Sequence, residues 1–518
     1  MIIKSVSVDA YRSIDTSGPL ELGPVTVLIG RNNSGKSALL RAMYLAQGSA
    51  HFSTDDCRLH SRQPVKVLME LATPYASPVL DAYSRGRTRR ESVVPADLAI
   101  KTAGRSSAGT SLVWNNGQSA HSSGVLPSER PDHLFVPVFS RRKVSAYDSS
   151  VDAARSRSVA VTDHNLTAWL NSLSGEHAEA RRFRELVKRV LGDGASIGTY
   201  ATDNGQQPGF QLNQYQGVSL DRMGEGVSGV ITILAELASP GRRVLLLEEP
   251  ENDLHPEALH ELLNVILEAV TDHGYQVVVS THSDVVLRTL GSATDAVIYR
   301  TTQAPSADGV PTTTYTRLGS AIERREALAD LGYDVSAPVG WLIFEESTAE
   351  RFFREILIPE FVPKLAGFRV LAAGGTGKVQ RTFEDLRRFM LFVQKSDDPE
   401  PEPRAWVLVD GDQSGQRAAT KLATTFTRWP PDRFITFEQP AIEQYYPSRF
   451  SDRVTAIETA RSRGADWLEQ GELKGDLIAD ICGWYHGPDF SRAEIEESAH
   501  ELIDVLQTIA SKHADLYK

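Results

Sequence analysis

The apolar positions in the first 300 residues fall into short continuous runs. Residues 26–29, 244–247 and 276–279 are almost entirely Val, Leu and Ile. A run of this length without polar alternation is typical of a strand that is buried on both faces. Residues 38–46 follow the first run after a glycine-rich turn and have the apolar spacing of a helix. The pattern therefore predicts an α/β fold.

A similar pattern begins again near residue 340. Residues 339–353 combine an apolar run, an acidic pair and an amphipathic helix, and residues 406–409 form another apolar run. Residues 491–513 place apolar side chains on one helical face, which indicates core packing or an oligomer contact. We predict three regions: an α/β domain at 1–335, a smaller α/β domain at 336–450 and a helical C-terminal region at 451–518.

A long segment separates the first predicted helix from the next motif. Residues 49–219 begin with strand-like patterns, for example at residues 65–71, and continue into helical spacing at residues 166–191. We interpret the whole segment as an insertion in the first domain.

Length and composition agree with an intracellular protein of more than one domain. The chain has 518 residues, which exceeds what a single hydrophobic core normally supports. Its two cysteines, Cys57 and Cys482, suit a reducing compartment better than a disulfide framework. No apolar segment is long enough for secretion or for spanning a membrane, so we expect a cytoplasmic protein without a membrane partner.

The charge balance excludes a uniformly basic surface. The net charge is −12, but basic residues cluster at 85–90, 141–143 and 181–189. Each cluster is equally consistent with phosphate contacts to nucleic acid and with a solvated loop or helix face.

Residues 30–37, GRNNSGKS, have the spacing of a P-loop. We predict that Gly30, Asn33 and Gly35 bring the backbone close to nucleotide phosphates at the start of a helix. Lys36 then reaches the terminal phosphates, and Ser37 is a ligand of Mg²⁺. The sequence thus predicts ATP and magnesium as cofactors; the alternative is an ordinary glycine-rich turn.

Two adjacent acids follow the strand at residues 244–247. An unpaired carboxylate at a buried strand end is unfavourable unless a metal or hydrogen bonds compensate. We assign Glu248 to the magnesium ligands and Glu249 to activation of the attacking water. His282, at the end of the third apolar run, is a candidate phosphate sensor. The alternative is that the acids cap the helix that begins near residue 255.

A second acidic site follows the run at residues 406–409. Asp410 and Asp412 are separated by one glycine, and two carboxylates this close repel unless a cation lies between them. Magnesium or manganese is the simplest such cation. Glu345 stands at another strand end. The alternative is that the aspartates only form a turn.

The order of the motifs resembles ABC-type ATPase heads, and most closely the RecF-like and OLD families. The motifs are Tyr11-Arg12-Ser13, GRNNSGKS, residues 223–237, LLLEEPENDLHP and VVSTH. The resemblance implies that Gly224, Gly226 and Ser228 act on nucleotide held by another subunit, so it implies a homodimer or higher homo-oligomer. It also implies an inserted helical arm within residues 49–219. Glu248 replaces the usual aspartate, and no counterpart of the magnesium-sensing glutamine is found.

Residues 339–447 resemble the Toprim domain of topoisomerases, primases and OLD-family nucleases. By this resemblance Glu345, Asp410 and Asp412 hold one or two metals that act on a phosphodiester, and Glu443 is a further ligand. The chain departs from the family pattern at Glu346, where glycine is usual, and at Ala349, where a second acid is common.

Together the resemblances imply an ATPase head fused to a nuclease that cleaves DNA or RNA, similar to bacterial anti-phage effectors. A separately encoded partner protein is a further possibility. The alternative is a regulatory ATPase that clamps nucleic acid or sequesters a partner, with a catalytically silent second domain.

Overall fold

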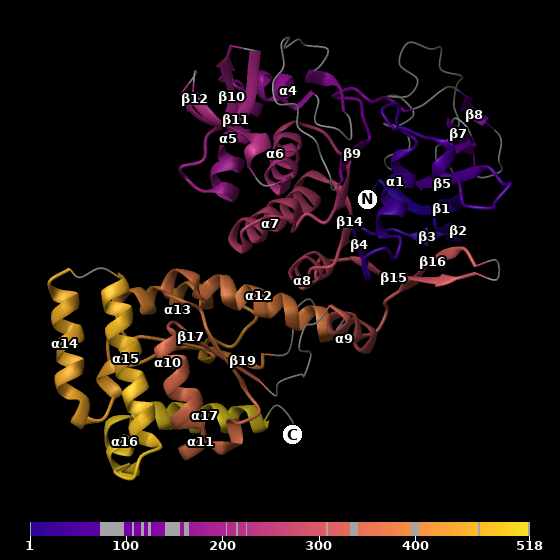
Figure 1. Cartoon of the computed structure of the whole chain (residues 1–518). Helices are drawn as coiled ribbons and strands as arrows, with labels where there is room; N and C mark the ends of the chain where they lie inside the picture. The colour runs from indigo at the N-terminus through magenta and orange to yellow at the C-terminus, as the bar shows by residue number, and fades with distance from the viewer. Residues whose placement is uncertain are drawn as a thin grey trace. The chain divides into compact units, whose positions relative to one another are not determined.

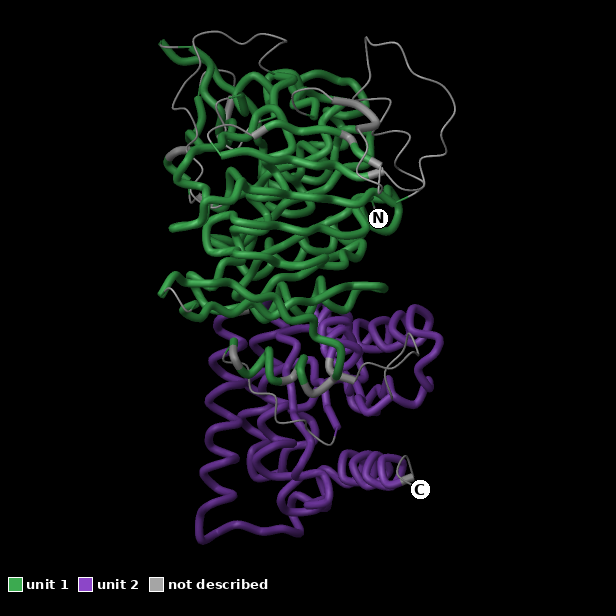
Figure 2. Tube along the Cα trace, turned by 90° about the vertical axis from the view of Figure 1, so that its right-hand side faces the viewer, with its two compact units in different colours: residues 1–334 green, residues 335–518 purple. Residues whose placement is uncertain are grey.

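The computed structural model divides the chain into two compact units, unit 1 at residues 1–334 and unit 2 at residues 335–518 (Figure 2). We describe each unit by itself. In the part of the chain that the structure describes, no helix is long and apolar enough to cross a membrane. The described residues are 2–72, 98–105, 108–114, 119–122, 126–139, 156–159, 165–203, 205–213, 216–223, 225–306, 309–331, 340–394, 403–464 and 467–515.

Unit 1 is built around a central six-stranded sheet in the order β16-β15-β4-β14-β13-β9. All neighbours are parallel except the β15–β16 hairpin. The three strands expected from the apolar runs are the centre of this sheet, which confirms the α/β prediction. The strands are β4 (Val25–Ile29), β9 (Phe135–Val138), β13 (Val244–Glu248), β14 (Gln276–Thr281), β15 (Val297–Pro305) and β16 (Pro311–Arg317).

Helices cover both faces of the central sheet. Helix α1 packs between this sheet and a second one, and Figure 1 shows α6 and α7 on the side away from α1. Helix α7 begins at Pro256, and Gly274, directly after its last residue, has the left-handed conformation. Both residues are common at these helix boundaries. The helices of unit 1 are α1 (Lys36–Tyr44), α4 (Leu166–Ser172), α5 (Ala178–Leu191), α6 (Glu225–Ala238), α7 (Pro256–His273), α8 (Asp284–Gly291) and α9 (Ala321–Asp330).

A second, antiparallel sheet has the order β2-β1-β5-β6-β7-β8, with β3 paired to β1. The buried side chain of Gln276 joins the two sheets, because it accepts from the amides of Ile2 and Ile3 and donates to the carbonyls of Ile3 and Gly23. The strands are β1 (Ile3–Tyr11), β2 (Ile14–Thr16), β3 (Leu20–Glu21), β5 (Val65–Leu71), β6 (Leu98–Gly104), β7 (Ala108–Trp114) and β8 (Ser119–Ser122).

The described part of residues 49–219 contains helices α4 and α5, where helical spacing was predicted, but most of its elements are strands, so it differs from the expected helical arm. Its strands β5 to β8 extend the antiparallel sheet and β9 completes the central sheet. The remaining strands, β10 (Ile197–Thr202), β11 (Gly205–Asn213) and β12 (Gln216–Ser219), form a small sheet that leads toward α6. The alternating burial along Val65–Leu71 explains the outcome, since such a strand needs a neighbour on an existing sheet.

Unit 2 contains a parallel four-stranded sheet in the order β18-β17-β19-β20. The strands are β17 (Trp341–Phe344), β18 (Arg369–Ala372), β19 (Ala405–Val409) and β20 (Phe434–Thr436). The helices are α10 (Ser347–Phe352), α11 (Ile358–Phe361), α12 (Thr376–Gln394), α13 (Gln413–Thr425), α14 (Ser451–Ser462), α15 (Trp467–Tyr485), α16 (Arg492–Ser498) and α17 (His500–Asp515).

The C-terminal helices of unit 2 share one core with its sheet. Leu502, Leu506 and Ile509 of α17 are buried in the same cluster as Leu342 of β17 and Leu408 of β19. The apolar face predicted at residues 491–513 therefore serves core packing. The chain breaks that helix at Ala499, between α16 and α17.

Candidate functional site

The predicted P-loop connects β4 to α1, as expected. Gly35 caps α1 in the left-handed conformation, with a φ of 95°. A Cβ atom on Gly35 would lie 2.1 Å from Oγ1 of Thr313, and one on Gly30 would lie 2.3 Å from the carbonyl oxygen of Thr301. The β15–β16 hairpin thus lies too close to the loop for any side chain at these two positions.

The same hairpin links the loop to the Tyr11-Arg12-Ser13 motif. Thr313 Oγ1 lies 2.8 Å from Ser13 Oγ and 3.1 Å from the carbonyl oxygen of Ser34. The hydroxyl of Tyr315 donates to the carbonyl of Gly35 at 3.2 Å. The hairpin contacts carbonyl oxygens of the loop, so it holds the loop in place without occupying the loop's backbone amides.

Lys36 and Ser37 occupy the positions that nucleotide binding requires. Lys36 is buried and donates to the carbonyls of Gly30 at 2.7 Å and Arg31 at 3.1 Å. Burial lowers the pKa of Lys36, although Glu249, Glu251 and Glu248 oppose this shift. The ammonium therefore lies inside the loop and close to the acids at the end of β13.

Glu248 joins the P-loop helix to β13. Its Oε1 accepts a hydrogen bond from the Ser37 hydroxyl, and its Oε2 lies 2.9 Å from the guanidinium of Arg41. Buried Ser34 Oγ has no hydrogen-bond partner among the described residues. A carboxylate and a hydroxyl in contact suit Mg²⁺, so Ser37 and Glu248 fit the predicted metal.

Glu249 and His282 face each other at the ends of β13 and β14. Glu249 has a positive φ of 48°, and its Oε2 accepts from the side-chain amide of Asn252 at 3.0 Å. His282 Nδ1 lies 3.5 Å from Glu249 and 3.5 Å from Glu251. Glu251 also accepts from the Thr281 hydroxyl at 2.6 Å. The sequence argument did not single out Glu251, which lies in a polar turn where acids are common.

A cavity of about 730 Å³ opens beside the P-loop. It brings His282 to the same surface as the loop backbone, which is the arrangement that a phosphate sensor needs. Its wall is formed by Ile29, Gly30, Arg31, Asn32, Asn33, Ser34, His282, Arg300, Thr301, Thr302, Gln303, Ala327 and Leu331.

Of the three residues predicted to act on a partner's nucleotide, Gly224 lies outside the described residues. A Cβ on Gly226 would lie 1.9 Å from the carbonyl oxygen of Asn252, so a close approach within the subunit already requires this glycine. Ser228 is buried in α6. The role of these residues in a second subunit stays a prediction.

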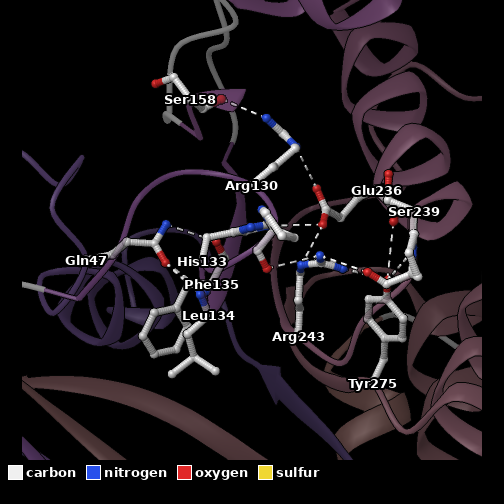
Figure 3. A network of polar contacts seen from close by, with 12 residues as sticks. Gln47, Arg130, His133, Leu134, Phe135, Ser158, Glu236, Ser239, Arg243 and Tyr275 are labelled. Carbon is white, nitrogen blue, oxygen red and sulfur yellow. Dashed lines mark hydrogen bonds and ion pairs between the residues drawn. The ribbon is translucent and has the colours of Figure 1, made fainter. Parts of the chain in front are cut away.

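The C-terminal half of α6 is fixed by a buried ionic network (Figure 3). The carboxylate of Glu236 lies 2.9 Å from His133, 3.0 Å from Arg243 and 3.2 Å from Arg130. Burial alone would raise the pKa of Glu236, but the facing His133, Arg130 and Arg243 side chains outweigh it and hold that pKa well below its usual range. Arg130 also stacks on Trp169 of α4. The helix that carries Gly226 and Ser228 is thereby tied to the segments that lead into β9 and β13 and to α4.

The basic cluster at residues 181–189 lies on α5 and is largely engaged within unit 1. Arg189 pairs with Glu261 at 3.1 Å and Glu268 at 2.7 Å, both on α7. Arg184 pairs with Glu176. These contacts favour the structural interpretation of this cluster over phosphate binding. The clusters at 85–90 and 141–143 lie outside the described residues.

In unit 2, Glu345 lies directly after β17. Its Oε1 accepts a hydrogen bond from the Thr376 hydroxyl, whereas its Oε2 is buried and has no partner among the described residues. Burial raises the pKa of Glu345, as do Glu346 and Asp412, while hydrogen bonds from the Thr376 hydroxyl and the Asp410 backbone oppose part of this shift. This oxygen is a candidate ligand of a cation.

Asp410 and Asp412 have different surroundings. Asp410 is buried at the end of β19, and burial together with Glu345, Glu443 and Glu346 raises its pKa to about 8. Asp412 caps α13, because its Oδ1 accepts from the amide of Gly415 at 2.7 Å. Asp412 therefore makes the turn contacts that were the alternative to metal binding.

Lys474 of α15 enters this acidic group, and the sequence argument missed it. Its Nζ lies 2.6 Å from Glu346 and 3.0 Å from Glu443. Burial would lower the pKa of Lys474, but Glu443 and Glu346 outweigh it and raise that pKa. A single lysine on a distant helix gives no sequence signal. The four predicted acids thus belong to one region, where a lysine already pairs with Glu443.

Throughout the described ranges, no three His, Cys, Asp or Glu side chains are arranged to hold a metal ion together. In unit 2 the unpartnered oxygen of Glu345 and the buried carboxyl of Asp410 fit a divalent cation by their chemistry. Asp412 and Glu443 make other contacts instead, so their part in a metal site stays a prediction.

Two protein-family models match unit 1. One, described as "AAA domain, putative AbiEii toxin, Type IV TA system", matches residues 105–288, and another, described as "AAA ATPase domain", matches residues 1–82. No curated protein sequence matches the chain.

Solved structures of SMC heads are similar to part of the chain. The SmcHead bound to the C-winged helix domain of ScpA is 14% identical, with a TM-score of 0.40, and the match covers 61% of this chain and 98% of that one. The SMC head domain from Thermotoga maritima is 13% identical, with a TM-score of 0.33, and the match covers 61% of this chain and 100% of that one.

The family matches include both halves of the nucleotide site. Residues 1–82 contain the P-loop, and residues 105–288 contain Glu248, Glu249 and His282. Unit 1 therefore contains a P-loop ATPase domain of the AAA type.

Proposed function

We propose that the protein hydrolyses ATP in unit 1 and cleaves nucleic-acid phosphodiesters with a divalent metal in unit 2. The proposal keeps the OLD-like and Toprim-like interpretation of the sequence. It also assigns the protein to bacterial defence, because the description of one matching family names a toxin of a type IV toxin–antitoxin system.

In unit 1 the residues around the P-loop bind and orient ATP. Gly30, Asn33 and Gly35 shape a loop whose amides meet the phosphates at the start of α1. Lys36 leaves the two carbonyls that it now contacts and pairs with the terminal phosphates. Ser37 and Glu248 would hold Mg²⁺, which would neutralise phosphate charge.

Glu249 accepts a proton from the attacking water. Its contact with Asn252 fixes the carboxylate, and its positive φ turns it away from the direction of β13. His282 borders the cavity beside the loop and contacts the terminal phosphate there. Its position next to Glu249 and Glu251 couples this contact to the two acids. Gly224, Gly226 and Ser228 complete the site of another copy, so the active form is a homodimer or higher oligomer.

In unit 2 the proposed metal ligands are Glu345 and Asp410, with Asp412 and Glu443 as further ligands. A divalent metal, magnesium or manganese, activates water and stabilises the leaving oxygen when it is bound. Lys474 places a positive charge beside these acids, where it stabilises charge that develops on the phosphate.

One observation carries the nuclease proposal: the carboxylates of Glu345 and Asp410 are buried in one region, and the hydrogen bonds that Glu345 receives from the Thr376 hydroxyl and the Asp410 backbone offset only part of the cost of its burial. Carboxylate oxygens buried together without compensation are unfavourable for the fold alone. A cation removes this cost. The substrate is DNA or RNA, because the phosphodiester is common to both.

A second candidate function is a regulatory ATPase with a silent unit 2, which clamps nucleic acid or acts on a separately encoded partner. The observation that favours it is the engagement of the acids by protein groups. Lys474 pairs with Glu346 and Glu443, and Asp412 caps α13. In this alternative the ammonium group of Lys474 neutralises the acids in place of a metal ion.

The two activities are separated by two charge-removing substitutions. Asp410→Asn is expected to lower cleavage of supercoiled DNA, linear DNA or transfer RNA by on the order of 100-fold or more and to leave ATP hydrolysis unchanged. Glu249→Gln is expected to bind ATP and to lower its hydrolysis by at least about 100-fold. Cleavage is measured with magnesium or manganese, with and without ATP.

Each variant is the control for the other, because both remove one acid at a strand end. Equal cleavage by wild type and Asp410→Asn would contradict the nuclease proposal. Absence of cleavage by wild type on every substrate would favour the regulatory ATPase. Normal hydrolysis by Glu249→Gln would contradict its assignment as the base.

A further inference from the structure

The β15–β16 hairpin places two side-chain hydroxyls against consecutive carbonyl groups of the P-loop. Thr313 and Tyr315 lie two residues apart on β16, so both side chains are on the same face of the strand. Oγ1 of Thr313 donates to the carbonyl of Ser34 at 3.1 Å, and the Tyr315 hydroxyl donates to the carbonyl of Gly35 at 3.2 Å. The hairpin therefore contacts the two peptide groups that lead into α1.

These two contacts determine the direction of the next two amides. In a trans peptide group the carbonyl and the following N–H point in opposite directions. A hydroxyl that holds the Ser34 carbonyl toward the hairpin thus directs the amide of Gly35 away from it. The Tyr315 hydroxyl does the same for the amide of Lys36. Amides at the start of a helix have no acceptor within the helix, and in a P-loop they bind phosphate.

Packing leaves Thr313 little freedom to take another position. Its side chain is buried, with 1% exposure. A Cβ atom on Gly35 would lie 2.8 Å from the methyl carbon of Thr313, so this methyl group packs directly against the loop. The amide of Thr313 also donates to the carbonyl of Ser13 at 2.8 Å. Thr313 thus supplies both a packed methyl group and a donor, and a β-branched side chain has few rotamers.

The two loop carbonyls differ in how much they depend on the hairpin. The Gly35 carbonyl also accepts from the amide of Ala38 at 3.1 Å, so α1 itself helps to hold it. For the Ser34 carbonyl, Thr313 is the one donor found among the described residues. Thr313 shares its single hydroxyl proton with Ser13 Oγ, which lies 2.8 Å away. The peptide group between Ser34 and Gly35 is therefore the one that the hairpin controls most.

We propose that Thr313 and Tyr315 are positioning residues of the ATPase, which fix the amides of Gly35 and Lys36 in the direction of the nucleotide phosphates. Both side chains act through the loop carbonyls and do not touch the nucleotide. The inference rests on ATP hydrolysis in unit 1 and is independent of the proposed nuclease. It gives the β15–β16 hairpin the role of preparing the P-loop for phosphate before ATP binds.

The substitution Thr313→Val tests the contact with Ser34, because it removes the hydroxyl and keeps the β-branched shape. The phosphates are charged in both the ground state and the transition state, so a misdirected amide changes KM rather than kcat. We expect the KM for ATP, and the Kd for a fluorescent ATP analogue with Mg²⁺, to rise about tenfold. We expect kcat to stay within about twofold of wild type. A variant that only loses stability would instead show a lower kcat and an unchanged KM.

Thr313→Ser is the conservative variant. It keeps the donor and removes the methyl group that packs against Gly35. Its melting temperature is expected to fall, while KM and Kd stay within about twofold of wild type. A rise of about tenfold in KM for Thr313→Ser would assign the effect to packing and overturn the positioning role.

Tyr315→Phe is expected to raise KM and Kd by only about threefold, because the Ala38 amide still holds the Gly35 carbonyl. The matched control is Tyr299→Phe on β15 of the same hairpin. The Tyr299 hydroxyl donates to the carbonyl of Glu21 at 2.9 Å, which is not part of the P-loop. Both variants lose one bond from a tyrosine hydroxyl to a carbonyl, but only Tyr315→Phe is expected to change KM and Kd. An equal rise in Tyr299→Phe would show a general weakening of the hairpin and contradict the proposal.

The outcomes separate this inference from the activity on which it rests. If wild type neither binds the ATP analogue nor releases phosphate from ATP, the ATPase proposal fails and this inference fails with it. If wild type does both and Thr313→Val has wild-type KM and Kd, only the positioning role is overturned. Should Thr313→Val not fold, Tyr315→Phe and Tyr299→Phe decide, and equal KM and Kd in these two variants would overturn the positioning role.

Discussion

The two candidate sites differ in how their charges are compensated. In unit 1 the two acids assigned to magnesium and water have protein partners, because Glu248 contacts Ser37 and Arg41 and Glu249 contacts Asn252, although Oε2 of neighbouring Glu251 is buried without a hydrogen-bond partner in the described residues. In unit 2 the compensation is incomplete. Lys474 pairs with Glu346 and Glu443, while one oxygen of Glu345 stays buried without a partner in the described residues.

This difference indicates how each site would respond to its ligand. The site in unit 1 must exchange existing contacts when ATP and magnesium bind, because Lys36 and Glu248 are engaged within the protein. In unit 2 one buried oxygen of Glu345 has no hydrogen-bond partner among the described residues to exchange. A divalent cation is therefore expected to bind unit 2 in the absence of nucleotide, whereas the metal of unit 1 arrives with ATP.

The largest expected effect within this comparison concerns Lys474. Lys474→Met removes the lysine that pairs with Glu443 and Glu346, and the loss of one partner of a buried pair destabilises a fold by about 3 kcal/mol. Added Mg²⁺ or Ca²⁺ is expected to restore part of this stability, because the released carboxylates bind the ion. Thermal unfolding of the full chain measures both effects.

The matched control for Lys474 is Lys421→Met, which removes an exposed lysine from α13. Its stability is expected to equal that of wild type. Wild-type stability of Lys474→Met would show that the pair is not a structural counter-ion contact. Destabilisation without rescue by divalent ions would favour the regulatory ATPase.

A smaller effect is expected from Arg41 in unit 1. The pair with Glu248 is partly exposed, so its loss is worth about 1 kcal/mol. Arg41→Gln is therefore expected to lower ATP hydrolysis about fivefold, because Glu248 is held less firmly for magnesium. Steady-state phosphate release at saturating ATP measures it. An unchanged rate would show that Ser37 alone positions Glu248.

The P-loop site was largely predictable from the sequence because its parts are contiguous or follow strands directly. Residues 30–37 and the pair Glu248-Glu249 occupy the expected ends of β4 and β13. The sequence did not indicate the roles of Thr313, which contacts the P-loop, and of Glu251, which contacts Thr281 and His282. Their roles depend on a hairpin and a turn that approach the site only in the folded chain.

Less of unit 2 could be predicted, since its site is assembled from distant segments. The strand ends at Glu345 and Asp410 were found from their apolar runs, but Lys474 lies on α15, where nothing local distinguishes it. The strand at residues 65–71 and the helical spacing at residues 166–191 were found from the sequence, but the family resemblance alone suggested that the segment forms an arm, and no local pattern shows that its strands join the sheets of unit 1.

The central claim is that the acids of unit 2 hold a divalent cation. The most direct measurement is Mn²⁺ binding to the full chain by electron paramagnetic resonance without nucleotide, with wild type and Asp410→Asn compared. We predict that wild type binds Mn²⁺ under these conditions and that Asp410→Asn binds it at least about tenfold more weakly. ATP should add a further bound ion to both proteins. Equal Mn²⁺ binding by the two proteins, or binding only after ATP is added, would contradict the account.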